Sequence, residues 1–213
     1  MNEFLKALRD DHKDFDEGVL EDHFGKTPFK LFSVWYKEAF EKETEPNAMS
    51  IATVGKDGQP SNRIVYLKEC IDEQFIFYTN YSSDKGRDIA ENPKVNLLFF
   101  WPQAQRQLRI DGVAKKVSEE ISDEYFNSRP RGSQLGAWAS MQSQKLDSRN
   151  LLEEKLIELD KKYPNVVPRP PHWGGYVIDP NRIEFWQGRP SRLHDRIVYE
   201  KPGSDWKTYR LNP

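Results

Sequence analysis

The segment RPSRLHDRIVYE alternates charged and apolar residues around a histidine. If it forms a strand, side chains two residues apart project from the same face, so Arg192, His194 and Arg196 lie together. Two guanidinium groups beside an imidazole can bind an anion or an electron-rich ring. The alternative is an exposed, charged edge strand whose side chains are only solvated, which is the commoner situation for such a segment taken alone.

A second candidate is YFNSRPRGSQLGAW. Arg129 precedes Pro130, which disfavours helical backbone, so a helix that begins after Ser118 should end there. Ser133 can then cap a new helix, and a helix N-terminus with a hydroxyl and nearby arginines favours a phosphate site. Tyr125, four residues before Arg129, lies on the same helical face. The alternative is a helix-turn-helix with ordinary capping.

Further polar groups occur in SNRIVYLK, YTNYSSDKGR and MQSQ. In a regular strand Arg63 and Lys68 project to opposite faces, so they could serve two different anions. Hydroxyls and Lys85 at a helix start form a possible phosphate cradle, although the same residues are common in turns. Gln107 and the amides of residues 141–144 need hydrogen-bond partners if they are buried. Each of these groups could equally be a surface group.

The elements that position these residues follow from periodicity and from helix signals. Pro28 opens an amphipathic helix, whose apolar residues are Phe29, Phe32, Trp35, Tyr36 and Phe40. Strands are expected at 48–54, 63–68 and 74–79, in VNLLFFW and QRQLRIDGVAKKV, and in GGYVI, RIEFWQG and RLHDRIVYE. Helices are expected at 83–91, after Ser118, and in DSRNLLEEKLIELDKKYP. This order does not alternate βαβ, so we expect an α+β fold, an antiparallel sheet or barrel with helices packed outside.

Composition narrows the class of protein. The chain has 213 residues, 37% hydrophobic and 31% charged, with a formal net charge of −2, which is typical of a soluble globular protein. We expect a flexible N-terminal arm over residues 1–27 and a single domain over 28–213. No basic excess indicates nucleic-acid binding, and no apolar run approaches membrane-spanning length. The single Cys70 fits a reducing, cytoplasmic location, and histidine and cysteine are too scarce for a metal site.

In this order, RIVYLK, FYTN, RQLRIDG, YFNSRPRGSQLGAWAS–QS, EFWQG and RLHDR resemble the pyridoxamine 5′-phosphate oxidase family, over nearly the whole chain from about residue 28. The resemblance implies an FMN-binding split β-barrel, antiparallel and Greek-key-like, in a homodimer with FMN at the subunit interface. It also implies oxidation of pyridoxamine or pyridoxine 5′-phosphate at the 4′ carbon to pyridoxal 5′-phosphate, with FMN as hydride acceptor. Dioxygen is then the final acceptor, giving hydrogen peroxide, and the amine substrate releases ammonia.

Matching motif positions extends the resemblance to single residues. It implies that the substrate phosphate is held by Lys68, Tyr125, Arg129 and Ser133, and that Arg192 and His194 lie over the pyridine ring as catalytic residues. The implied FMN contacts are Arg63, Ile64, Val65, Tyr66, Leu67, Lys68, Tyr78, Thr79, Lys85, Gln107, Gln142, Ser143, Trp186 and Arg196. The cofactor carries the difficult step, so no metal is expected.

The chain departs from the family pattern in two places. It reads Ser83, Asp84, Lys85 where the family usually has Ser-Arg-Lys, and its N-terminal RDDHKDFDEG lacks the usual Arg and Tyr pattern. We expect Arg87, three residues after Asp84 on the same helical face, to supply the missing charge, with Asp84 capping the helix or pairing with Arg87. Two other functions stay open: a flavin reductase or other oxidoreductase on the same barrel, and a non-catalytic pyridoxal-phosphate carrier.

Overall fold

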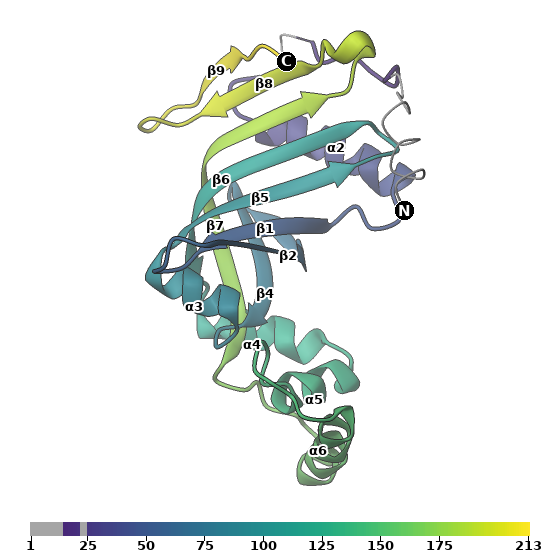
Figure 1. Cartoon of the computed structure of the whole chain (residues 1–213), viewed down its shortest axis with the longest axis vertical. Coiled ribbons are helices and arrows are strands. Elements are labelled where there is room, and N and C mark those ends of the chain that lie inside the picture. The colour runs from purple at the N-terminus through teal and green to yellow at the C-terminus, as the bar shows by residue number, and fades with distance from the viewer. Residues whose placement is uncertain (1–14, 22–24) are drawn as a thin grey trace, which may run out of the picture. The chain divides into compact units, whose positions relative to one another are not determined.

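The structure, a computed structural model, describes residues 15–21 and 25–213, so most of the expected N-terminal arm lies outside the described residues. Figure 1 labels the elements along the chain. Their bounds are α2 (Phe29–Lys42), β1 (Ala48–Val54), β2 (Pro60–Tyr66), β3 (Glu69–Ile71), β4 (Gln74–Asn80), α3 (Asp84–Glu91), β5 (Lys94–Trp101), β6 (Arg106–Lys116), α4 (Glu119–Ser128), α5 (Arg131–Ala139), α6 (Arg149–Lys162), β7 (Trp173–Gln187), the 3-10 turn η1 (Pro190–Arg192), β8 (Asp195–Glu200) and β9 (Lys207–Arg210). None of the helices in the described part of the chain combines the length and the apolar character needed to cross a membrane.

The strands form one sheet in the order β2-β1-β5-β6-β7-β4-β3, with β8 paired to β7 and β9 to β8. The β1–β2, β3–β4, β4–β7, β7–β8 and β8–β9 pairs are antiparallel. The chain divides into two compact units. Unit 1 comprises Met1–Pro46, Leu98–Ile110 and Arg182–Pro213, and unit 2 comprises Asn47–Leu97 and Asp111–Asn181.

Unit 1 is built around α2 and the aromatic side chains of its strands. Trp35 meets Phe185 edge to face with ring centroids 5.1 Å apart, and Phe185 meets Tyr199 in the same way at 5.8 Å. All three side chains are buried, and aromatic pairs of this geometry stabilise a core beyond the area that they bury. Phe40, expected on the apolar face of α2, is instead 72% exposed. The buried stripe of α2 consists of Leu31, Phe32, Trp35 and Ala39, which excludes position 40.

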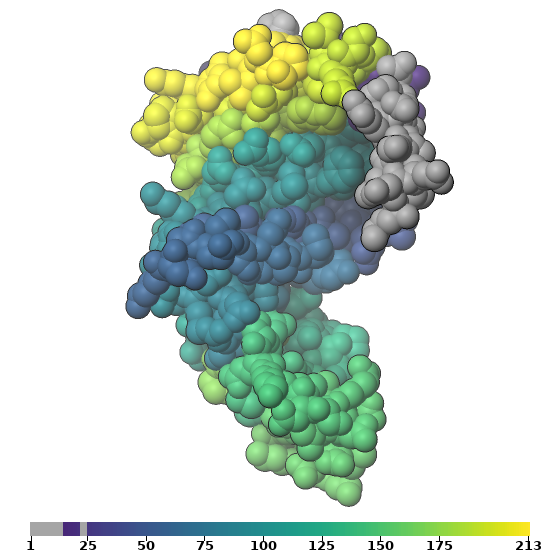
Figure 2. Space-filling view, viewed as in Figure 1, coloured from purple at the N-terminus to yellow at the C-terminus, as the bar shows by residue number. Residues whose placement is uncertain are grey.

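Unit 2 joins strands β1–β4 to the helices α3–α6. Ser83, Ser118 and Ser148 cap α3, α4 and α6, because each hydroxyl accepts a hydrogen bond from a free backbone N–H of the first turn. The stripe expected on α6 is confirmed: Leu159 is buried, and Leu152, Leu156 and Tyr163 pack against the core of Phe126, Leu135, Ala139, Val167 and Trp173. The outer side of α5 and α6 is open to solvent in Figure 2, where these helices are green.

Three expected boundaries are wrong. GGYVI and RIEFWQG belong to one strand, β7. Pro180 lies inside it, between the residues that pair with β4 and those that pair with β8, so its missing N–H breaks neither ladder. The strand expected at 63–68 begins earlier and ends at Tyr66, so Lys68 lies beyond it. Burial still alternates to residue 68: Arg63, Val65 and Leu67 are more buried than their neighbours Ile64, Tyr66 and Lys68.

The third boundary concerns α5, which begins at Arg131. Ser133 is therefore the third residue of the helix and not its cap. Pro130 occupies the cap position, and its carbonyl accepts the backbone N–H of Ser133 at 2.8 Å. The expected end of α4 is correct: Arg129 is its C-terminal cap in extended backbone, as the following proline requires.

Candidate active site

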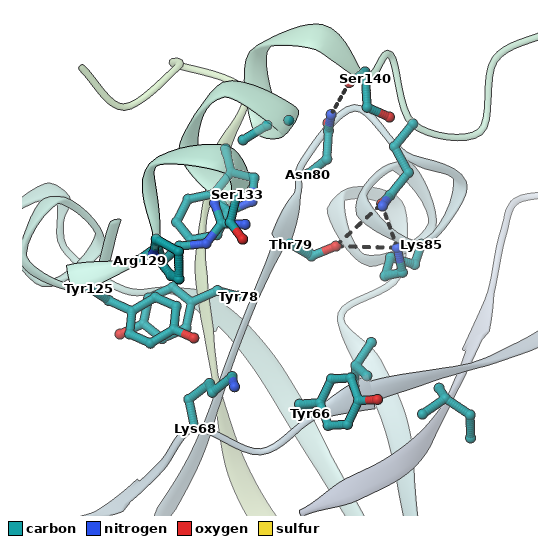
Figure 3. Close-up of a pocket in the computed structure, with 17 residues that line it drawn as sticks. Tyr66, Lys68, Tyr78, Thr79, Asn80, Lys85, Tyr125, Arg129, Ser133 and Ser140 are labelled. Atoms are coloured by element: carbon teal, nitrogen blue, oxygen red, sulfur yellow. Dashed lines mark hydrogen bonds between the residues drawn. The ribbon is translucent and has the colours of Figure 1, made fainter. Parts of the chain in front are cut away.

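A cavity of about 690 Å³ opens in unit 2 where β2, β4, α4 and α5 meet. Figure 3 shows its labelled side chains converging from the strands and helices. Most of the site residues expected in this unit line it: Ile64, Val65, Tyr66, Lys68, Tyr78, Thr79, Lys85, Tyr125, Arg129, Ser133 and Gln142. Asn80, Pro130, Gly136, Ala137, Ser140 and Trp173, which sequence reasoning missed, also contribute to the wall.

Arg129 dominates the helical side of the cavity. Its guanidinium carbon lies 4.5 Å from the ring centroid of Trp173, which supports it by a cation–π contact. The Nη1 atom is buried and has no hydrogen-bond partner within residues 15–21 and 25–213. Burial also lowers the pKa of Arg129 from its usual value. A buried guanidinium N–H without an acceptor is unfavourable, so this group is suited to an anion that enters the cavity. In Figure 3 Ser133 lies beside it.

Two stacked phenols form the wall between the helices and β4. The rings of Tyr78 and Tyr125 are 3.8 Å apart and nearly parallel, and Trp173 continues the stack 5.7 Å from Tyr78. The Tyr78 hydroxyl donates to Glu69 at 2.9 Å. Burial, followed by this carboxylate, raises the pKa of Tyr78, which keeps the phenol neutral. The stack is a rigid surface from which the Tyr125 hydroxyl can reach a ligand.

Lys85 is a cation inside the cavity wall, only 7% exposed. Its Nζ donates to Gln142 Oε1 at 2.8 Å, to Thr79 Oγ1 at 3.2 Å and to Ser83 Oγ at 3.3 Å. All three acceptors are neutral, and among the described residues no carboxylate reaches ion-pair distance of this amine. Burial, with a smaller contribution from Arg63, lowers the pKa of Lys85 to about 8. Lys85 therefore has an uncompensated charge for an anionic ligand.

Three expected cofactor residues of this unit do not line the cavity. Leu67 is buried in the core. Ser143 lies beside α3, where its hydroxyl accepts the Asp84 backbone N–H at 3.2 Å. Arg63 donates to Thr53 Oγ1 at 2.6 Å, and the Thr53 hydroxyl donates in turn to Asp88 at 2.6 Å. The Arg63 charge still acts on the cavity, through its effect on the pKa of Lys85.

The expected pairing of Asp84 with Arg87 is confirmed. Arg87 forms an ion pair with the Asp84 carboxylate and donates from Nη1 to the Ser82 carbonyl at 2.5 Å. Both side chains are more than half exposed. Asp84 does not cap the helix, because Ser83 does so. Gly86 in the same turn approaches the Tyr81 carbonyl so closely that a Cβ would overlap it, which explains the glycine.

The other expected site residues lie in unit 1, and the predicted Arg192–His194–Arg196 strand face is wrong. β8 begins only at Asp195, after the turn Pro190–Arg192. Ser191 and Arg192 have φ angles of 57° and 61°, in the left-handed region that non-glycine residues rarely adopt. Arg196 lies on β8, directly opposite Trp186 on β7.

His194 is held in a defined state. The Arg189 backbone N–H donates to its Nδ1 at 3.1 Å, so Nδ1 carries the lone pair and the neutral ring has its proton on Nε2. Burial and the charge of Arg192 both lower the pKa of His194, which favours this neutral form. Trp186 lies 4.5 Å from the imidazole centroid and Phe15 lies 5.6 Å from it.

Sequence reasoning missed a carboxylate at the centre of this part of unit 1. Glu184 is 1% exposed and lies 2.7 Å from Arg196, 2.9 Å from Arg182 and 3.6 Å from Arg109. Burial alone would raise the pKa of Glu184, but the hydrogen bonds from Arg182 and Arg196 outweigh it and the pKa is lowered. Period two in RIEFWQG places Glu184 and Trp186 on one strand face, and this was the available signal.

Groups of His, Cys, Asp or Glu that could hold a metal ion do not occur among residues 15–21 and 25–213. The cation-rich groups in both units instead favour anionic organic ligands.

Comparisons with known proteins identify the family of the chain. The family described as pyridoxamine 5′-phosphate oxidase matches residues 36–163, and the pyridoxine 5′-phosphate oxidase C-terminal dimerisation region matches residues 173–213. A protein of Bordetella pertussis named pyridoxine/pyridoxamine 5′-phosphate oxidase is 52% identical over 210 residues, covering 97% of this chain and all of the relative. One with the same name from Acaryochloris marina is 50% identical over 211 residues, covering 98% of this chain and 95% of the relative.

Solved structures extend the likeness to the fold. PhzG from Burkholderia lata 383, in complex with tetrahydrophenazine-1-carboxylic acid, superposes with a TM-score of 0.85 at 32% identity, covering 92% of this chain and 98% of that one. An FMN-binding protein of Nostoc punctiforme, related to pyridoxamine 5′-phosphate oxidase, superposes with a TM-score of 0.72 at 16% identity. The superposition covers 89% of this chain and 100% of that one. The expected α+β split-barrel fold is confirmed. The chain belongs to the pyridoxamine 5′-phosphate oxidase family.

Proposed function

We propose that this protein is an FMN-dependent oxidase that converts pyridoxamine 5′-phosphate and pyridoxine 5′-phosphate to pyridoxal 5′-phosphate. The observation that carries the proposal is the charge pattern of the unit 2 cavity. Arg129 has a buried N–H without an acceptor, and the Lys85 amine contacts only neutral oxygens in the described part of the chain. One cavity thus offers two separate cationic positions, as an enzyme that binds two phosphorylated molecules requires.

The residues present fit FMN. In unit 2, Lys85 is suited to its phosphate, and Thr79 and Gln142 offer polar groups beside it. In unit 1, Gln107, Trp186 and Arg196 offer an amide, an aromatic ring and a cation to the flavin ring system. When bound, FMN supplies the oxidising chemistry, with dioxygen as the final acceptor, hydrogen peroxide as a product and ammonia released from the amine substrate.

The remaining residues bind and orient the substrate. Arg129, Lys68, Ser133 and Tyr125 hold its phosphate in this proposal, with the free Arg129 Nη1 as the strongest donor. Arg192 and His194 lie over the pyridine ring, and the neutral His194 ring offers an N–H from Nε2. This donor can orient an acceptor on the substrate without taking a proton at Nδ1, which the Arg189 N–H already occupies.

The oligomeric state and the location of the protein are proposed from the same family. We propose a homodimer with FMN contacts from both subunits, in agreement with the match of residues 173–213 to a dimerisation region. Residues 28–213 act as one functional domain in the cytoplasm, and no nucleic acid or membrane is part of the reaction.

The test is the reaction itself. Purified protein should be yellow, carry one FMN per subunit and elute as a dimer. With pyridoxamine 5′-phosphate it should consume oxygen and release hydrogen peroxide and ammonia, and unphosphorylated pyridoxamine should react far more slowly. A carrier would bind pyridoxal phosphate without consuming oxygen, and a flavin reductase would oxidise a reduced nicotinamide cofactor instead. A colourless protein that ignores added FMN would refute the proposal.

A further inference from the structure

Glu184 on β7 is a buried carboxylate with arginines as its charged partners. Its Oε1 atom faces Arg196, and its Oε2 atom faces Arg182 and Arg109. A buried carboxylate is unfavourable unless it is well paired, and a hydrophobic residue would commonly stabilise such a position equally well. The proposed chemistry makes no use of this carboxylate, so its presence calls for another explanation.

The contacts of Arg196 suggest what the carboxylate does. Arg196 donates from Nε to Glu184 Oε1 at 2.9 Å, its Nη2 lies 2.7 Å from the same oxygen, and its Nη1 donates to the Asn212 carbonyl at 3.0 Å. A guanidinium has five N–H groups in a fixed plane. These contacts fix that plane, and the remaining N–H groups of Arg196 meet no acceptor among the described residues.

The surrounding strand face also carries Trp186, another expected cofactor residue of unit 1. Glu184 and Trp186 are two residues apart on β7 and share a face, and Trp186 is directly opposite Arg196 in the β7–β8 register. Arg182 and Arg109 pair with the second oxygen of Glu184, so the carboxylate does not cancel the positive charge at this face. It holds Arg196 in place while leaving a net positive cluster.

We propose that Glu184 is a positioning residue of the cofactor site, which orients Arg196 so that its remaining N–H groups meet an acceptor on FMN. This inference rests on the proposed function, since it assumes that the protein binds FMN. A purely structural role of Glu184 would affect FMN affinity with or without Arg196. In the proposed role, the effect of Glu184 on FMN affinity depends on Arg196 alone.

A double-mutant cycle on FMN binding tests this. FMN is titrated into the apo form of the full-length protein, and Kd is measured from flavin fluorescence. Glu184→Gln should raise Kd by about tenfold or more, because an oriented charge-assisted hydrogen bond is lost. In an Arg196→Met background the same substitution should change Kd by less than about twofold. Glu200→Gln, on the exposed end of β8, is the matched control and should bind FMN like the wild type.

Two results would overturn the inference: wild-type affinity in folded Glu184→Gln protein, or a full effect of Glu184→Gln in the absence of Arg196. If Glu184→Gln does not fold, as judged by circular dichroism, Glu184→Asp decides. It keeps the charge but withdraws the carboxylate by one methylene, so Kd should still rise at least about threefold, and an unchanged Kd would again overturn the inference. A wild-type protein that fails to bind FMN would instead refute the proposed function.

Discussion

The cavity of unit 2 and the strand face of unit 1 both concentrate cations, but they treat them differently. In the cavity, Lys85 contacts neutral oxygens, and the Arg129 Nη1 atom meets no acceptor among the residues that the structure describes. In unit 1, Arg196 pairs with Glu184 and Arg210 pairs with Asp195 at 2.9 Å. An unpaired cation can neutralise the charge of a ligand, whereas a paired cation is held in a fixed orientation by its partner. The first arrangement suits phosphate capture and the second suits orientation of a ring.

Arg192 is an exception within unit 1. It forms no hydrogen bond or ion pair with the residues that the structure describes, and it follows Ser191 in left-handed backbone. Such conformations persist where the surrounding structure imposes them, and they are frequent at functional sites. Arg192 should therefore bind a ligand directly through its charge, whereas Glu184 should orient Arg196 toward FMN.

The largest effect is expected at Arg129, the cation whose buried N–H meets no acceptor among the described residues. Arg129→Ala removes a charge-assisted hydrogen bond worth about 1.5–3 kcal/mol, so KM for pyridoxamine 5′-phosphate should rise roughly 10- to 150-fold. Arg131→Met is the control, because Arg131 is already paired with Asp160 at 2.6 Å. Steady-state kinetics on both variants checks the prediction, and equal KM changes would mean that unpaired and paired arginines do not differ.

Arg192→Ala should lower kcat/KM by at least about tenfold, or ~1.4 kcal/mol of transition-state binding, with FMN affinity unchanged. The reason is that Arg192 is expected over the substrate ring and not at the cofactor. Lys207→Ala, an exposed cation on β9, provides the control. Intact turnover in Arg192→Ala protein would mean that Arg192 is only a solvated surface charge, which is the alternative interpretation of RLHDR.

The charge of Lys85 should make FMN binding depend on pH. Its pKa of about 8 in the protein without ligand means that the amine loses its charge as pH rises through 8. The phosphate of FMN stays doubly charged above about pH 7, so FMN Kd should increase above pH 8 by up to about tenfold per pH unit. Binding FMN favours the charged amine, and the increase should level off at the higher pKa of the complex.

Titration of FMN between pH 7 and 9.5 checks this prediction. The groups near the amine are Thr79, Ser83 and Gln142, which do not titrate in this range, with Arg63 and Asp84 as the nearby charges. Lys85→Met should bind FMN weakly at every pH in this range. An equally steep pH dependence in that variant would assign the titration to another group.

The smallest effect is expected at the exposed Asp84–Arg87 pair. Asp84→Asn frees Arg87 and removes a negative charge near the proposed phosphate position, so FMN should bind equally well or up to about fivefold tighter. The gain should shrink in high salt, because exposed charges are screened. Arg87→Ala is the companion variant: a tenfold weaker affinity would support a phosphate contact by Arg87, and an unchanged one would leave it as the partner of Asp84 only.

Local signals made much of unit 2 predictable from sequence. Ser83 and Ser118 cap the helices as expected, and Pro130 ends α4 because it disfavours helical backbone at Arg129. Ser133 was misplaced as a cap because Pro130 already occupies the cap position, so α5 begins at Arg131, three residues earlier than a helix capped by Ser133 would begin.

The misplaced parts of unit 1 depend on contacts between distant segments. The alternation in RLHDR is compatible with a strand, but Ser191 and Arg192 adopt left-handed backbone and β8 begins only at Asp195. No short-range pattern shows that Glu184 will be buried among arginines from three strands, since this requires the sheet order. The resemblance of the motifs to a known family named the residues, and only the fold explains how they are oriented.

The contact between Arg196 and the Asn212 carbonyl is one of several hydrogen bonds that residues 210–212 make with earlier parts of the chain. Leu211 N–H donates to the Arg196 carbonyl at 3.0 Å, and Arg210 reaches the Leu20 carbonyl at 2.6 Å. Residues 210–212 therefore form hydrogen bonds with two earlier segments of the chain, around Leu20 and around Arg196. The surroundings of Arg196 are complete only when these residues are in place, so a variant without residues 210–212 should keep most of its fold and bind its ligand less tightly.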